Sequence, residues 1–107
     1  MSRDKRARFQ DIEVACIAII NYTSLVDVEA DVVFDAIRIR LVEIGEAVKA
    51  LDAEDLSTEH GIPWADMTRM RDLLAHRYFD TTHGIVMDTA RNDIPLLLQA
   101  INRLQKV

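Results

Sequence analysis

The sequence predicts an all-α protein, an antiparallel up-and-down bundle of four helices. Apolar residues recur in alternating steps of three and four along most of the 107 residues, which is the spacing of one helical face. The chain has only three glycines and two prolines, so it offers few positions for turns. Half of its residues are hydrophobic, which suffices for one buried core at this length. We therefore expect a single domain over residues 1–107.

The first two predicted helices are long, and each carries one apolar stripe. Ile17 and Ile20 lie on another flank of the first helix, which is therefore expected to contact neighbours on more than one side. Asp27 and Asp31 precede the second helix as candidate caps. The first stripe comprises Phe9, Ile12, Cys16, Ile19, Thr23 and Val26, and the second comprises Phe34, Ile37, Leu41, Ile44, Val48 and Leu51.

A polar segment over residues 52–63 separates these helices from two more. Gly61 suits the end of a helix, and Pro63 suits the first turn of the next one. The third helix is predicted to run from Pro63 to Tyr78. The fourth covers residues 85–104, and Pro95 should bend it because proline removes one backbone donor.

Composition limits the functions that this chain can have. A net charge of −5 argues against broad, nonspecific adhesion to nucleic acid, although local basic groups remain. No apolar run approaches the roughly 20 residues of a membrane span, and no apolar stretch follows the basic N-terminal residues. We expect a soluble, cytoplasmic protein. Its one cysteine, Cys16, lies in an apolar segment and is expected to pack as a small hydrophobe.

The segment RMRDLLAHRYFD, residues 69–80, carries the most unusual set of polar groups. On a helix, Arg71 and His76 point about 140° apart and lie about 7.5 Å apart along the axis, so they do not share a face. Asp72 and His76 are four residues apart, so the carboxylate can hold and orient the imidazole. The alternative is a solvated helix face with minor ion pairs, with Tyr78 as a partly buried aromatic.

Arg71 and His76 could act on one phosphate if two copies of this helix met across a twofold axis. The histidine could take the proton from a ribose 2′-hydroxyl, and the arginine could stabilise charge on the phosphate oxygens. Together they would suffice for metal-independent cleavage of RNA. A homodimer with the motif helix at its interface is therefore implied if the pair is catalytic.

The evidence for other functional residues in the sequence is weaker. Glu43 and Glu46 are three residues apart, but the helical carboxylate metal sites need a Glu-x-x-His pattern that the chain lacks, so we expect no metal site. Glu46 is expected to be a buried partner of an arginine or an interface residue. Trp64 is expected to anchor the core at the start of the third helix, and His60 and His83 to be solvated loop residues.

The segment RDLLAHRY, from Arg71 to Tyr78, resembles the Arg-x-x-x-x-His-x-Tyr motif of the HEPN superfamily, specifically of HepT-like toxins paired with minimal nucleotidyltransferase antitoxins. RIRLVEIGEAVKAL at residues 38–51 resembles that family's second-helix signature. IPWADMTRMRDLLAHRYFD at 62–80 and NDIPLL at 92–97 resemble its motif helix and its closing helix. The resemblance covers nearly the whole chain.

This resemblance implies a dimeric endoribonuclease toxin of a type II or type VII-like toxin–antitoxin pair. It makes Arg71 and His76 the catalytic pair and Tyr78 the residue that the antitoxin modifies with AMP, and it implies no cofactor. Glu46 and Arg77 are candidate substrate or interface contacts. Asp72 stands where asparagine is common, which lowers the local positive charge, and Arg77 stands where glycine is frequent.

A second hypothesis assigns the chain to a different class. It could be a noncatalytic, dimeric nucleotide-binding or adaptor subunit of a nucleotidyltransferase complex, with the motif kept for phosphate contacts. The net negative charge of the chain favours this alternative. The polar motif favours catalysis, because a purely structural interface excludes charge from its centre.

Overall fold

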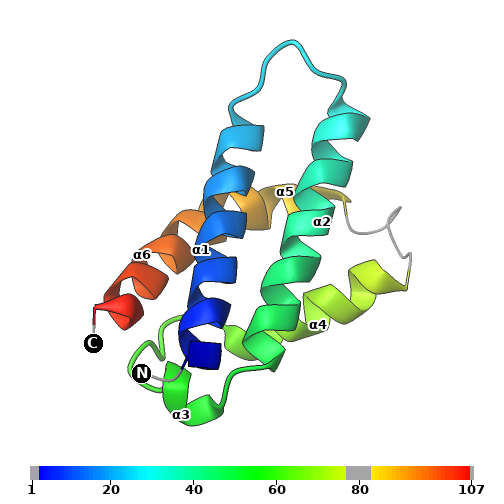
Figure 1. The fold of residues 1–107 in the computed structure, drawn as a ribbon. Helices are drawn as coiled ribbons and strands as arrows, with labels where there is room; N and C mark the ends of the chain where they lie inside the picture. The colour runs from blue at the N-terminus through cyan, green and yellow to red at the C-terminus, as the bar shows by residue number, and fades with distance from the viewer. Residues whose placement is uncertain (1–2, 77–82, 107) are drawn as a thin grey trace.

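The computed structural model describes residues 3–76 and 83–106, and every regular element in these two ranges is helical (Figure 1). The predicted all-α class is therefore confirmed. Over these ranges, no helix is both long and apolar enough to cross a membrane. The elements are α1 (Arg3–Thr23), α2 (Ala30–Lys49), α3 (Ala53–Leu56), α4 (Trp64–Ala75), α5 (His83–Asp88), the π-helical segment η1 (Thr89–Asp93) and α6 (Ile94–Gln105).

The helices α1 and α2 form a long antiparallel hairpin, and both predicted stripes face the core except at the tip of the hairpin. The helix α1 ends at Thr23, where the backbone amides of Ser24 and Leu25 bond back to carbonyls of the last turn. Val26 lies beyond this end and is 88% exposed, so its assignment to the buried stripe was wrong. The cap of α2 is Glu29, while Asp31 lies in its first turn.

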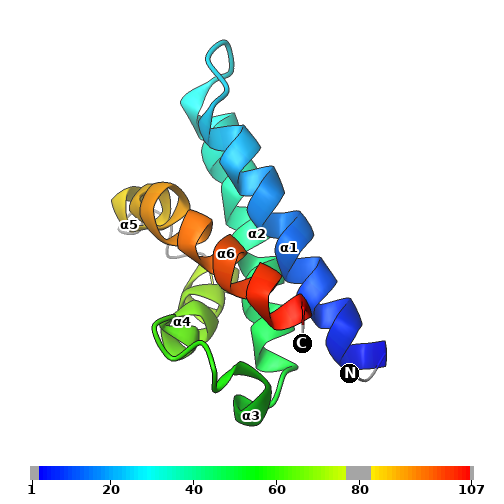
Figure 2. The same cartoon turned by 90° about the vertical axis from the view of Figure 1, so that its left-hand side faces the viewer.

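The helices α4 and α6 pack on the same face of this hairpin, over different helices of it (Figure 2). The helix α4 packs on α2, whereas α6 packs on α1, and both cross the hairpin obliquely (Figures 1 and 2). The helix α1 thus contacts α2, η1 and α6, as predicted, although Ile17 of its second apolar flank is exposed and only Ile20 packs against the core. The finer prediction of an up-and-down four-helix bundle is not confirmed, because α4 and α6 do not run alongside the hairpin axes.

The C-terminal helical segment follows the predicted fourth helix but is not a uniform α-helix. The residues Thr89–Asp93 adopt π-helical geometry immediately before α6, which carries Pro95 in its first turn. A proline ring would clash with the carbonyl four residues earlier, here that of Arg91, and a wider π turn relieves this crowding. The structure thus has a π-helical segment immediately before Pro95, while the bend itself stays a prediction.

The segment before α4 is more ordered than its polar composition suggested. It contains the short helix α3, whose first turn is closed by reciprocal capping between Asp52 and Asp55. Trp64 is partly buried against the core, and its indole Nε1 donates a hydrogen bond to the carbonyl of Glu59 at 3.0 Å. The predicted role of Trp64 as an anchor for α4 is confirmed.

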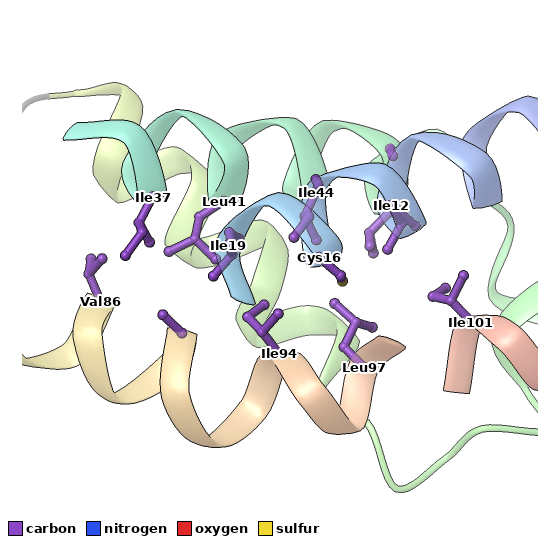
Figure 3. Packing of buried hydrophobic residues seen from close by; sticks show 14 of the residues in the cluster. Ile12, Cys16, Ile19, Ile37, Leu41, Ile44, Val86, Ile94, Leu97 and Ile101 are labelled. Atoms are coloured by element: carbon purple, nitrogen blue, oxygen red, sulfur yellow. The ribbon is translucent and has the colours of Figure 1, made fainter. Parts of the chain in front are cut away.

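The buried core joins α1, α2 and the C-terminal helices, with isoleucines of all three in contact (Figure 3). Cys16 lies within it and is fully buried, as predicted. Burial, with a smaller contribution from Glu13, raises the pKa of the Cys16 thiol to about 12.

We expect Cys16 to be unreactive in the folded protein, because the nucleophilic thiolate is scarce near neutral pH and the sulfur is covered. A thiol-specific chromogenic reagent should react with it only on unfolding. Its rate at pH 8 should rise along the urea unfolding curve, and rapid labelling of the native protein would contradict this expectation.

A second testable contact links the segment before α4 to α6. Arg103 donates hydrogen bonds from Nε and Nη2 to the two carboxylate oxygens of Glu59, at 3.0 and 2.7 Å. These bonds lower the pKa of Glu59 in the folded state. The contribution to stability is therefore complete above the unfolded pKa and is lost as the pH falls through the folded value.

We expect Glu59→Gln to lower the thermal midpoint at pH 7 by a few degrees at most, and by less as the pH falls toward 3. Melting curves from pH 3 to 7 test this. Glu54→Gln is the control, since Glu54 is exposed and has no ion pair among residues 3–76 and 83–106. A Glu59→Gln deficit that does not change with pH would contradict the argument.

Candidate functional site

The close approach of α4 to α2 positions the first motif residue. Gly45 is buried in α2, and a Cβ placed on it would overlap the Cβ of Arg71. The same Cβ would lie 2.9 Å from the Arg71 Cγ and 3.1 Å from the carbonyl oxygen of Met67. Only glycine lets the two helices come this close. The Arg71 side chain therefore starts directly against the surface of α2.

Two carboxylates hold the Arg71 guanidinium. Its Nε pairs with Oε1 of Glu46 on α2, and its Nη1 donates to Oδ1 of Asp72 at 2.9 Å. The hydrogen bond to Asp72, together with Glu46, raises the pKa of Arg71. The same bond from Arg71 lowers the pKa of Asp72, with further contributions from Lys49 and His76. In this chain, the charge of Arg71 is therefore balanced by acidic neighbours.

His76 lies at the end of α4. The helix stops at Ala75, short of the predicted end at Tyr78, and His76 is its C-cap. The imidazole Nδ1 lies 2.6 Å from the backbone carbonyl oxygen of Asp72. Because a carbonyl can only accept, Nδ1 carries the proton, which leaves Nε2 as the nitrogen that can accept one.

The prediction that the Asp72 carboxylate holds His76 is therefore corrected. The spacing of four residues does bring Asp72 to His76, but the backbone carbonyl rather than the carboxylate makes the contact. The carboxylate turns to Arg71 instead, because the guanidinium is a stronger donor with a permanent charge. Asp72 thus contacts both motif residues through two different groups.

Within one chain, Arg71 and His76 do not converge. The Arg71 side chain is directed to Glu46 on α2. The exposed side chain of His76 lines a shallow hollow on the outer face of α4, and the other residues that line this hollow are Arg69, Met70, Asp72 and Leu73. This agrees with the prediction that the two side chains lie on different faces.

The remaining predicted site residues have different outcomes. Arg77 and Tyr78 lie outside the described residues. Glu46 is a partner of an arginine, as predicted, but it is exposed rather than buried. Glu43 pairs with Arg40 at 3.2 Å. Over residues 3–76 and 83–106, no three His, Cys, Asp or Glu side chains gather into a group that could hold a metal ion.

Sequence reasoning missed two features of this site. The approach at Gly45 was not foreseen, although the Ile-Gly-Glu-Ala segment that contains it was noted. A glycine in the middle of a strong helical pattern is costly for the helix, and this cost is the signal that something packs against it. Lys49, one turn after Gly45, was not singled out, yet its charge acts on Asp72.

Comparison with known proteins places this arrangement in a family. A protein named "Putative RNase MJ0127" from Methanocaldococcus jannaschii is 31% identical over 97% of this chain and 89% of its own length. "Probable ribonuclease HepT" from Thermococcus cleftensis is 39% identical, with 64% and 63% covered.

A longer M. jannaschii protein, "Gamma-glutamylcyclotransferase and putative RNase MJ0434", is 35% identical. That match covers 67% of this chain and 32% of the longer protein. No solved structure gives a significant match. The profile of the family described as "Ribonuclease HepT-like" matches residues 12–104, which include Gly45, Glu46, Arg71 and His76, and the chain therefore belongs to the HepT-like ribonuclease family.

Proposed function

We propose that this protein is a metal-independent endoribonuclease, the toxin of a toxin–antitoxin pair that acts in the cytoplasm. The family and the ribonuclease names of its relatives support an endoribonuclease. The observation that carries the assignment of residues is the state of His76. It is exposed at the end of α4, with Nδ1 held by a carbonyl and Nε2 left to accept a proton.

The proposed reaction uses the 2′-oxygen of the RNA as its nucleophile. Nε2 of His76 takes the proton from the 2′-hydroxyl, and the 2′-oxygen attacks the adjacent phosphorus. The bond to the 5′-oxygen breaks and this oxygen takes a proton from water, which leaves a 2′,3′-cyclic phosphate and a 5′-hydroxyl. The Arg71 guanidinium binds the phosphate oxygens and stabilises the charge of the transition state. To do so, it must release at least one of its two carboxylate partners.

A homodimer would bring the two groups together. The outer face of α4 carries His76 and the partly exposed Leu73, and a twofold axis through this face would oppose two copies of the motif helix. Arg71 of one copy could then act with His76 of the other on one phosphate. Two copies would also double the number of positive charges near the phosphate, which would offset the net negative charge of the chain.

We further propose that a minimal nucleotidyltransferase antitoxin neutralises the protein by adding AMP to Tyr78. Tyr78 follows His76 by two residues in the sequence. A bulky, negatively charged nucleotide near a phosphate-binding arginine would block RNA by its volume and its charge.

One observation favours the second candidate function, a noncatalytic, dimeric nucleotide-binding or adaptor subunit of a nucleotidyltransferase complex. Glu46 and Asp72 neutralise Arg71 in the isolated chain, and an arginine held in this way binds phosphate less readily.

Cleavage of a labelled RNA pool in excess chelator distinguishes the two functions. A ribonuclease of the proposed kind makes new ends that carry 2′,3′-cyclic phosphates. A folded protein that leaves the pool intact would support the adaptor function instead.

Replacement of Asp72 by asparagine should strengthen RNA binding. The exposed carboxylate competes with phosphate for Arg71, and asparagine keeps an acceptor without the charge. We expect the affinity for an RNA oligonucleotide to rise about two- to fivefold, the range of exposed ion pairs. Fluorescence anisotropy in a His76→Ala background measures this without cleavage. Asp66→Asn is the matched control, because Asp66 is an exposed acid on α4 that pairs with Arg69. Equal gains in RNA affinity from both variants would contradict a specific effect at Arg71.

A further inference from the structure

The oblique packing of α4 leaves an open cleft between α4 and the C-terminal helical segment, and this cleft adjoins the hollow at His76, because Met70 lines both. Its floor is formed by Leu41 and Ile44 of α2. One wall carries Met67 and Met70 of α4, and the opposite wall includes Ile85 of α5. The cleft has a volume of about 290 Å³, close to the lower limit of the sites that hold small organic molecules.

Most of the residues that line the cleft are apolar, and the charged ones are all negative. Asp66 belongs to the α4 wall, and Asp93 belongs to the opposite wall. Asp66 is paired with Arg69 on its own helix, whereas Asp93 has no ion pair within the described part of the chain. Thr89 adds a hydroxyl to the same wall as Asp93. Carboxylates at this position disfavour phosphates and nucleotides, and they favour a cation.

The π-helical segment contributes to the same cleft. Thr89 and Asp93 are its first and last residues, and both line the cleft. Short π segments in longer helices occur frequently at functional sites, because the extra residue in the turn redirects neighbouring side chains. Ile85, one turn earlier, is a large apolar side chain that remains 54% exposed at the cleft. The wall therefore combines an exposed apolar surface with a carboxylate that has no ion pair among the described residues.

We propose that this cleft binds a small organic cation, a molecule with an apolar body and one protonated amine. The apolar body would lie between the methionines of α4 and Ile85, over Leu41 and Ile44, while the ammonium group would meet Asp93. Such a ligand would contact α4 at Met67 and Met70, and Met70 also lines the hollow at His76. The proposal is independent of the proposed function, because it requires no RNA and no catalysis.

Methyl NMR of the full chain tests the site with a matched set of probes. The probes are 1-naphthylmethylamine, which is protonated at pH 7, the neutral 1-naphthylmethanol, and the anionic 1-naphthylacetate. Carbon-13 methyl labels on methionine report the location, since Met67 lines the cleft alone, Met70 lines both the cleft and the hollow at His76, and Met87 packs on the core and lines neither. For probes of about 12 non-hydrogen atoms, we expect dissociation constants in the millimolar range.

The expected result is movement of the Met67 and Met70 signals but not that of Met87, with the amine bound at least about threefold more tightly than the alcohol. The naphthylacetate should bind most weakly. Asp93→Asn should bring the amine and the alcohol to within about twofold of each other. Asp88→Asn should leave the preference unchanged, because Asp88 is exposed on the same helical segment but does not line the cleft.

Three outcomes would overturn the proposal. Equal affinity of the wild type for all three probes would show that charge has no part in recognition. Signals that move equally at Met67, Met70 and Met87 would show nonspecific association of the naphthyl group. Methionine signals at the cleft that change on dilution without any probe would show that a second copy of the chain covers it.

Discussion

Replacement of His76 by alanine is expected to lower the rate of RNA cleavage by roughly 10²- to 10⁴-fold, the usual contribution of a general acid or base. The fold should be unaffected, because the side chain is exposed and its one described hydrogen bond goes to a carbonyl that water can reach. Single-turnover cleavage of an RNA oligonucleotide in excess chelator measures the loss. Circular dichroism and thermal melting establish that the variant remains folded.

His60→Ala is the matched control, since His60 is an exposed histidine in the segment between α3 and α4 and lies outside the motif. It should cleave at the rate of the wild type. If His76→Ala cleaves as fast as His60→Ala, the general-base role is excluded and another group must accept the proton. If neither the wild type nor the variants cleave RNA, the adaptor function becomes the better account.

The helices of this protein could be predicted from its sequence because their apolar stripes are long and regular. Helical periodicity records which face of each helix is buried, and residues such as Ile12, Ile37 and Ile101 are indeed fully buried. It does not record the angle at which two buried faces cross. The prediction of aligned helices is therefore not confirmed at α4 and α6, and the crossing of α4 leaves a cleft that the stripes did not indicate.

The candidate site could be predicted in its residues but not in its contacts. Spacing placed Arg71 and His76 on different faces of one helix, and the structure agrees with this. Spacing also paired Asp72 with His76, but it could not tell a carboxylate from a backbone carbonyl. The choice depends on competition, because Asp72 has Arg71 beside it as a stronger partner. Arg71, Asp72 and His76 all belong to α4 or its C-cap, so the spacing brought both possible partners to Asp72 but did not decide between them.

Replacement of Gly45 by alanine is expected to have the largest effect on stability of any conservative change in α2. The new Cβ would overlap the Cβ of Arg71, which is fixed to the backbone of α4 and cannot rotate away. The two helices must therefore separate. We expect the free energy of unfolding to fall by about 1–3 kcal/mol, the typical cost of overpacking. Urea denaturation measures this value.

Gly84→Ala is the control for this change. Gly84 is also helical, in α5, but a Cβ there meets no atom within 4 Å among the described residues. Alanine is the better helix former by about 1 kcal/mol, so this variant should be as stable as the wild type or more so. Equal losses from both substitutions would contradict an effect of close helix approach.

The same variant also tests whether the approach of α4 to α2 serves Arg71. Combined with Arg71→Gly, which removes the Cβ, Gly45→Ala should cost less than it does alone, so that the two changes are not additive. Combined with Arg71→Ala, which keeps the Cβ, it should cost as much as it does alone. If the losses in free energy of unfolding add in both pairs, the cost of Gly45→Ala comes from the Met67 carbonyl, the other close neighbour of Gly45. If Arg71 binds the phosphate as proposed, a folded Gly45→Ala protein should also cleave RNA more slowly than its folded fraction explains, because separation of the helices displaces the guanidinium.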